Sequence, residues 1–196
     1  MKKIAVINDL SGLGKCSLTV QACPLPTAVL SNQTGYESYF CEDFTEHMEP
    51  YMEQWKKRGF FPDGIYTGFL SDDKQADRIL KFMDAFAGKD TLILTDPVMG
   101  DDGAVYPIYK ELQKASEARR MEEIREIGCG LARKFSLPAV VITGVDHKEE
   151  GQPLKMGNLV LENGNSSWVF AEKSGGSYSG TGDLFASVLS AGLVKR

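Results

Sequence analysis

Short apolar runs alternate with longer segments of helical periodicity, and this alternation constrains the fold of the chain more than any other feature. The expected strands cover residues 4–7, 27–30, 64–67, 91–95 and 139–143. The expected helices cover residues 43–58, 71–87 and 117–135, where apolar residues recur at helical spacing among charged ones. Strands joined by helices pair in parallel, because each helix returns the chain to the edge of the sheet where it started. The sequence therefore predicts a layered α/β fold.

A second pattern appears late in the chain. Two apolar runs, 158–161 and 167–170, flank a segment that contains Asn163-Gly164. Asn-Gly is a strong signal for a tight hairpin turn. We therefore expect three layers, with a central, mostly parallel sheet flanked by helices and a late antiparallel hairpin. The composition is that of an ordinary globular protein, so we expect residues 1–196 to form one domain.

Polar or Gly-rich segments follow each strand expected in the parallel sheet. They cover residues 8–15, 31–36, 68–70, 96–101 and 144–146. Each could be a plain turn, but ligands of such sheets bind at the carboxyl ends of the strands, and the five loops are expected to converge there. A P-loop is excluded, because the G-x-x-x-x-G-K-[ST] spacing is absent and Cys16 stands at the hydroxyl position.

The tetrapeptide Gly180-Thr181-Gly182-Asp183 opens an apolar run that is predicted to be helical. Its glycines permit a tight turn into the helix, whose first N–H groups can hold a phosphate. Asp183 could accept a proton from an attacking hydroxyl there, although Asp is also a common first-turn residue. Asp96, at the end of another strand, could be a Mg²⁺ ligand, or it could simply end the strand. The Gly180–Asp183 tetrapeptide therefore suggests a kinase.

Charge and composition exclude several other classes of function. The net charge of −5 and the pI near 5.2 argue against a nucleic-acid surface. No apolar stretch reaches the roughly 20 residues that span a membrane, and the start of the chain lacks a signal-peptide pattern. His47 and His147 are far from each other in the sequence, and the four cysteines show no C-x-x-C spacing. A zinc site is therefore disfavoured. We expect a cytoplasmic protein with free thiols.

Taken together, these motifs resemble the ribokinase-like superfamily, and within it the pyridoxal/pyridoxine kinases. The resemblance rests on an ordered set of segments: residues 7–12, 23–36, 67–70, 96–101 and 180–183. It implies ATP-dependent, Mg²⁺-assisted phosphorylation of the 5′-hydroxymethyl group of pyridoxal, pyridoxine or pyridoxamine, a reaction of vitamin B6 salvage. By analogy it also implies a homodimer whose partners are these small molecules and ATP.

The resemblance also implies roles for individual residues. Asp183 would be the base, and the amides of Gly180, Thr181 and Gly182 would form the anion hole. Asp96 would lie near Mg²⁺ and the nucleotide phosphates. Thr143 and Gly144 would border the ATP site. The residues expected around the pyridine ring are Asp9, Ser11, Gln33, Thr34 and Tyr36. Many relatives carry His where Gln33 stands, and Gln can donate and accept hydrogen bonds but cannot become cationic.

The chain departs from this family in its connections. The segment around 20/21 is shorter than a parallel crossover requires. Around 113/114 the chain lacks the strand and the glutamate-bearing loop that the family places there, and relatives continue beyond the helix that follows Asp183. We expect that stretches of a longer protein are missing at these points; an intact mass of 21.6 kDa for the natural protein would contradict this. The alternative is a truly shortened, inactive relative.

Two other functions stay open. Hydroxymethylpyrimidine kinase belongs to the same superfamily and phosphorylates a similar hydroxymethyl heteroaromatic. A non-catalytic protein that binds B6 vitamers or nucleotides is favoured if the glutamate loop that relatives bring to the metal is truly absent.

Overall fold

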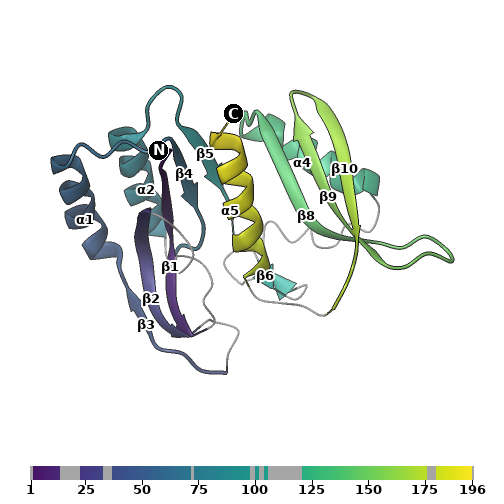
Figure 1. Cartoon of the computed structure of the whole chain (residues 1–196), viewed down its shortest axis with the longest axis horizontal. Helices are drawn as coiled ribbons and strands as arrows, with labels where there is room; N and C mark the ends of the chain where they lie inside the picture. Colours follow the sequence, from purple (N-terminus) through teal and green to yellow (C-terminus); the bar gives the residue numbers. More distant parts are fainter. Residues whose placement is uncertain are drawn as a thin grey trace. The chain divides into compact units, whose positions relative to one another are not determined.

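The chain divides into two compact units, and each is described by itself. The first unit comprises Met1–Val98 and Tyr178–Arg196, and the second comprises Met99–Ser177. The computed structural model describes residues 2–13, 23–32, 37–71, 73–97, 100–101, 104–105, 121–175 and 180–195 (Figure 1).

A five-stranded sheet forms the centre of the first unit. Its strand order is β3-β2-β1-β4-β5. The strands are β1 (Ile4–Leu13), β2 (Cys23–Asn32), β3 (Cys41–Asp43), β4 (Gly64–Thr67) and β5 (Leu92–Thr95). β1 is parallel to both of its neighbours and β4 is parallel to β5, while only β3 runs antiparallel. The predicted mostly parallel sheet and four of its strands are thereby confirmed.

Helices cover both faces of this sheet (Figure 1). On one face, α1 (Thr45–Lys57) and α2 (Asp73–Phe86) enclose the main core, in which Ile7, Leu25 and Phe82 are fully buried. On the other face, α5 (Thr181–Val194) buries Ala186 against Val6 and Tyr66. The expected α/β layering therefore holds in this unit.

The first two strands are longer than the apolar runs indicated. β1 continues to Leu13, so residues 8–13, expected to begin a loop, belong to the strand. β2 begins at Cys23 and includes Pro24 and Pro26, although proline cannot donate to a ladder. The antiparallel partner β3 pairs only with Ala28 to Leu30. Both prolines therefore lie outside the part of β2 that pairs with β3.

The second unit contains a three-stranded antiparallel sheet with the order β10-β9-β8. Its strands are β8 (Ala139–His147), β9 (Lys155–Glu162) and β10 (Asn165–Glu172), and α4 (Met121–Lys134) packs on them. The predicted hairpin is confirmed: Asn163 and Gly164, with φ of 50° and 81°, form the turn between β9 and β10. Two short strands, β6 (Gly100–Asp101) and β7 (Ala104–Val105), pair antiparallel in the same unit.

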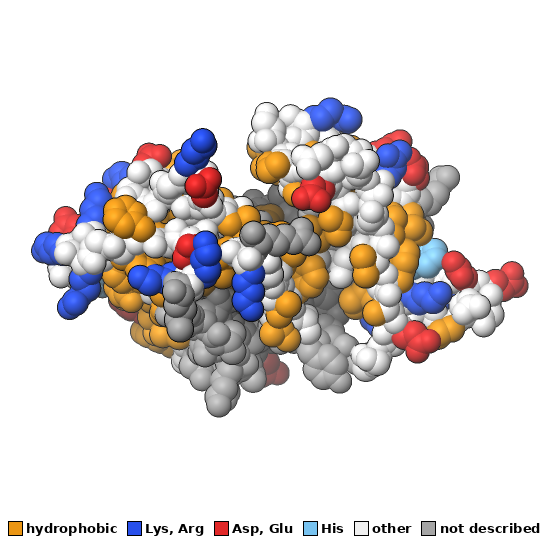
Figure 2. All heavy atoms as spheres, turned by 45° about the horizontal axis from the view of Figure 1, so that its top comes forward, with side chains coloured by type: hydrophobic (Ala, Val, Ile, Leu, Met, Phe, Trp, Pro, Cys, Tyr) orange, Lys and Arg blue, Asp and Glu red, His pale blue; other side chains and the backbone are white. Residues whose placement is uncertain are grey.

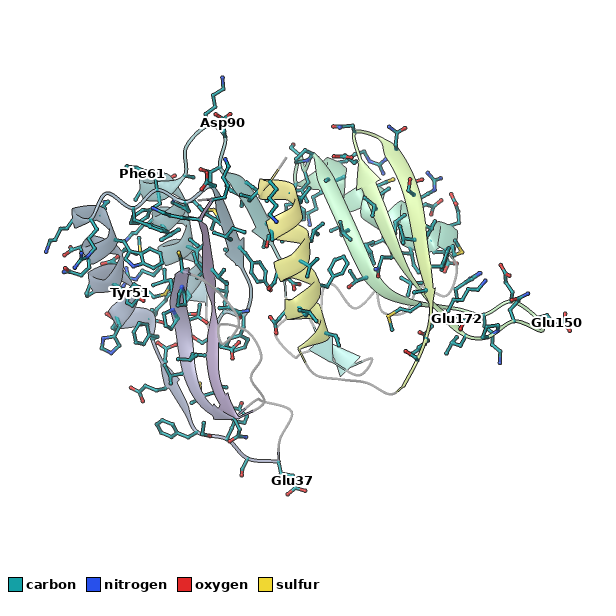
Figure 3. All side chains as sticks on the ribbon, in the orientation of Figure 1. Glu37, Tyr51, Phe61, Asp90, Glu150 and Glu172 are labelled. Atoms are coloured by element: carbon teal, nitrogen blue, oxygen red, sulfur yellow. The ribbon has the colours of Figure 1, made fainter. Side chains whose placement is uncertain are left out.

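One expectation for this unit was wrong. Residues 139–143 were expected to join the parallel sheet and residues 144–146 to form a loop, but both segments lie within β8, which pairs antiparallel with β9. A short apolar run does not specify its partner strand, and here the β8–β9 connection brings the two strands together as a hairpin. Glu150 lies at the tip of that connection (Figure 3).

On the face drawn in Figure 2, Lys and Arg side chains are interspersed with Asp and Glu. None of the helices among the described residues is both long and apolar enough to cross a membrane.

Candidate functional site

The start of α5 carries the most informative motif of the sequence. Gly180 caps the helix with φ of +82°, a left-handed conformation that glycine adopts without strain. The Leu184 N–H donates to the Gly180 carbonyl at 3.0 Å, so this bond closes the first helical turn. A Cβ at Gly182 would meet nothing within 4 Å. The predicted tight turn is confirmed, and the positive end of the helix has open space beside Gly182.

Asp183, in this first turn, meets side chains from two strands. Its Oδ1 accepts a hydrogen bond from Asn8 Nδ2 at 3.0 Å and a longer one from Tyr66 Oη at 3.4 Å. Asn8 lies on β1, level with the end of β4, and Tyr66 lies on β4. Asp96, which directly follows β5, is the alternative acceptor for the single Tyr66 hydroxyl proton. Four side chains, from β1, β4, the segment after β5 and α5, thus meet at one place.

This cluster has unusual electrostatics because it holds two carboxyl groups in a partly dry environment. Burial raises the pKa of Asp96, and the charge of Asp183 raises it further, although the hydrogen bond from Tyr66 opposes the shift. Burial also raises the pKa of Tyr66 well above its ordinary value, with the charges of Asp96 and Asp183 adding to the effect. Tyr66 therefore keeps its proton at neutral pH.

The donor set fits a magnesium ion that is shared with phosphates. Mg²⁺ is usually held by one or two carboxylates together with substrate phosphates and water, rather than by a cage of protein ligands. Asp96 would supply such a carboxylate, and Asp183 is near enough to raise the pKa of Asp96. Among the described residues, no group of three or more His, Cys, Asp or Glu side chains is gathered to hold a metal.

The residues expected around a substrate ring are only partly described. Asp9 is buried on β1 and lies close enough to Cys41 to contribute to the raised pKa of its thiol, after burial and the charge of Asp43. Ser11 belongs to β1, but its side chain lies outside the described part of the chain. Gln33, Thr34 and Tyr36 also lie outside it.

Thr143 and Gly144, expected beside ATP, lie on β8 in the second unit. The pairing with β9 shifts register between Ile142 and Val145, and Gly144 has φ of +76°. The Gly144 N–H donates to Asn158 Oδ1 at 3.2 Å. Such irregularities often occur beside active sites, and the role of this pair towards ATP stays a prediction.

Sequence reasoning missed two members of the cluster. Asn8 is only 1% exposed, and the Tyr66 ring is fully buried. Tyr66 resembled an ordinary strand residue, and Asn8 was considered only as part of a loop. The available signal was the position of Asn8, a polar residue directly after the apolar run 4–7, but its partner lies 175 residues away in the sequence.

Comparison with solved structures places the fold. A candidate phosphomethylpyrimidine kinase from Bacteroides thetaiotaomicron, crystallised with pyridoxal, matches with 33% identity and a TM-score of 0.86. The match covers 99% of this chain and 80% of that one. Pyridoxal kinase from Lactobacillus plantarum matches with 21% identity and a TM-score of 0.82, covering 100% of this chain and 81% of that one.

A third similar structure is the pyridoxal kinase from Leishmania donovani in complex with ADP. It has 20% identity and a TM-score of 0.78, and the match covers 100% of this chain and 80% of that one. No family model matches the chain. The first match is close enough in sequence to show kinship, and the other two show the same fold. The chain belongs to the ribokinase-like kinases, in the family that contains the pyridoxal kinases and phosphomethylpyrimidine kinases.

Proposed function

We propose that this protein transfers the γ-phosphoryl group of ATP to the 5′-hydroxymethyl group of pyridoxal or a related B6 vitamer. The observation that carries the proposal is the position of Asp183, in the first turn of a glycine-capped helix and within hydrogen-bond reach of side chains from the central sheet. The similar Bacteroides protein was crystallised with pyridoxal, which supports this choice of substrate class.

Asp183 acts as the general base. Its carboxylate accepts the proton of the hydroxymethyl group while the oxygen attacks the γ-phosphorus. The new bond joins that oxygen to phosphorus, the bond from phosphorus to the bridging oxygen breaks, and ADP leaves. The backbone amides of Gly180, Thr181 and Gly182, at the positive end of α5, hold the charge on the transferred group.

Asp96 serves the phosphate side of the same reaction, where it would hold Mg²⁺. When bound there, the ion would supply positive charge to the nucleotide phosphates. Asp96 follows β5 directly and is linked to Asp183 through the Tyr66 hydroxyl, so the metal side and the base side share one hydrogen-bonded cluster. Thr143 and Gly144 would border the nucleotide, and Asp9, Ser11, Gln33, Thr34 and Tyr36 would surround the pyridine ring.

A second candidate substrate is hydroxymethylpyrimidine. The Bacteroides protein, which has a higher identity to this chain than the two pyridoxal kinases, is described as a candidate phosphomethylpyrimidine kinase. This description favours hydroxymethylpyrimidine over unrelated alcohols as the alternative substrate. Both substrates present a hydroxymethyl group on a flat, polar ring, so the chemistry at Asp183 would be the same for both. The difference would lie in the residues that contact the ring.

Replacing Asp183 by Asn tests the role of the base. The amide keeps the size of the side chain but cannot take a proton. We expect turnover to fall roughly 10²-fold or more, with binding of pyridoxal and ADP largely unchanged. Steady-state kinetics and equilibrium binding measure the two effects. Asp90→Asn, at an exposed loop position (Figure 3), is the matched control and should keep normal turnover. Near-full activity of Asp183→Asn would refute the assignment.

A further inference from the structure

Asn8 is the most constrained polar side chain of the cluster. It is 1% exposed and makes three hydrogen bonds. Its Oδ1 accepts from the backbone N–H groups of Asp9, at 2.9 Å, and Phe69, at 2.8 Å. Its Nδ2 donates to Asp183 Oδ1 at 3.0 Å. The side chain therefore joins β1, the segment after β4 and the first turn of α5.

These partners fix which way the Asn8 amide points. Both backbone partners are donors, so only the side-chain oxygen can face them. The NH₂ group must then face Asp183, where it donates to the carboxylate. An amide held by two backbone groups cannot rotate without losing both bonds, so the donor is rigid.

Gly68 makes room for this arrangement. It lies beside Asn8 across the β1–β4 pair, where Ile7 is opposite Thr67. A Cβ at Gly68 would come within 2.6 Å of both Cγ and Nδ2 of Asn8. Real Cβ atoms do not approach other atoms so closely, and the amide would have to shift. The glycine of the Thr67-Gly68-Phe69 segment therefore has a packing role that the sequence alone did not reveal.

We propose that Asn8 is a positioning residue for the proton-accepting carboxylate of Asp183. The proposal rests on the proposed function, in which Asp183 is the base. A neutral amide orients the carboxylate without adding a positive charge that would hold its proton affinity down. Rigid orientation matters here because a misplacement of about 1 Å can cost on the order of 10²-fold in rate. Tyr66 Oη, at 3.4 Å, is a weaker second donor to the same oxygen.

The substitution Asn8→Asp is the sharpest test. It preserves size and one oxygen for the two backbone donors, but it presents a second oxygen, not a donor, to Asp183. We expect kcat to fall on the order of 10²-fold while KM for ATP and for pyridoxal and the affinity for ADP stay within about threefold. Asn163→Asp, in the turn between β9 and β10, adds the same charge and should leave kcat unchanged.

The exchanged pair Asn8→Asp with Asp183→Asn separates positioning from simple structural support. The pair restores a hydrogen bond with donor and acceptor reversed, so its Tm should recover towards that of the wild type while its turnover stays as low as that of Asp183→Asn alone. Asn8→Ser is the second variant if Asn8→Asp does not fold, because a shorter side chain fits the space and loses reach to Asp183. It should lower kcat with little change in KM.

The outcomes distinguish a failure of the positioning role of Asn8 from a failure of the base role of Asp183. If Asp183→Asn is inactive but Asn8→Asp and Asn8→Ser keep near-normal kcat, the positioning role is overturned and the base stands. Multiplicative losses of turnover in the exchanged pair would also overturn it, because residues that act through one another are not independent. If Asp183→Asn stays active, both the proposed function and the positioning role fail.

Discussion

At the scale of single residues, the cluster joins two carboxyl groups through neutral donors. Asp183 and Asp96 are bridged by the Tyr66 hydroxyl, and Asn8 supplies a further donor to Asp183. Neutral donors orient a base while stabilising its charged form less than a cation at the same distance would. The arrangement suits a group that must accept a proton.

The close approach of Gly68 to Asn8 gives a prediction at this scale. Gly68→Ala should displace the Asn8 amide, destabilise the protein by about 1–3 kcal/mol as an overpacked site and lower kcat. Denaturant unfolding and steady-state kinetics measure the two effects. Gly88→Ala is the matched control, since its nearest neighbour would be Thr91 Oγ1 at 3.7 Å, an ordinary contact. Normal stability and normal kcat in Gly68→Ala would show that the close packing has no consequence.

At the scale of elements, α5 combines a reactive start with a plain structural body. Its buried residues Ala186, Ser190 and Val194 recur every fourth position and face the sheet. Val194 Cγ2 lies 2.8 Å from the place where a Cβ of Gly64 would stand, so small residues allow the helix to approach the strand closely. The sheet therefore fixes α5, and α5 in turn carries the Gly180–Asp183 motif.

Two glycines of α5 allow the anion hole to be tested without disturbing the fold. A Cβ at Gly182 or at Gly192 would meet nothing within 4 Å, so Ala at either position should fold, with a gain of up to about 1 kcal/mol from helix propensity. If the phosphoryl group passes beside Gly182, Gly182→Ala should reduce kcat/KM roughly 10-fold or more, while Gly192→Ala keeps it. Equal activity of the two variants would remove Gly182 from the anion hole.

The start of α1 gives a prediction about pH. Burial tends to raise the pKa of Asp43, but hydrogen bonds from Ser71 and Thr45 outweigh it and bring the pKa below its ordinary value. A carboxyl with a lowered pKa in the folded state stabilises the protein above its ordinary pKa, and this contribution disappears as pH falls through the lowered value.

Asp43→Asn should therefore cost less than about 1 kcal/mol at pH 7, because solvent screens an exposed carboxylate, and progressively less below pH 3.8. Urea unfolding at pH 7 and at a pH below 3.8 measures the difference in this cost. Asp84→Asn, at an exposed position of α2, is the control for the loss of one helix carboxylate. A cost for Asp43→Asn that is the same at both pH values would contradict the account.

The sequence predicted elements better than it predicted their partners. The helices, the strand at residues 64–67 and the turn at Asn163-Gly164 follow from local periodicity and turn chemistry, and all are confirmed. The partner of β8 was wrong because strand pairing depends on the rest of the fold. Asn8 and Tyr66 were missed for the same reason, because their hydrogen bonds to Asp183 join residues that are 175 and 117 positions apart in the sequence.

At the scale of the whole molecule, the residues assigned to chemistry divide between the two units. Asp96, Asp183 and their neutral donors belong to the first unit, while Thr143 and Gly144 belong to the second. The first unit therefore contains the proton-transfer and metal side of the proposed reaction within one sheet and one helix. The match to the Bacteroides structure covers nearly all of this chain and 80% of that protein.

Residues 14–22 join the parallel strands β1 and β2, and such a crossover usually needs a dozen residues or more. The expectation that a stretch of a longer protein is missing at this point stays a prediction, which the intact mass of the natural protein tests.

The most direct measurement is formation of phosphorylated product from ATP and Mg²⁺, with pyridoxal and hydroxymethylpyrimidine supplied in parallel. The account predicts pyridoxal 5′-phosphate and ADP in equal amounts, with the higher kcat/KM for pyridoxal and loss of product in Asp183→Asn. A clear preference for the pyrimidine would replace the proposed substrate and keep the mechanism. No transfer to either alcohol would contradict the central claim.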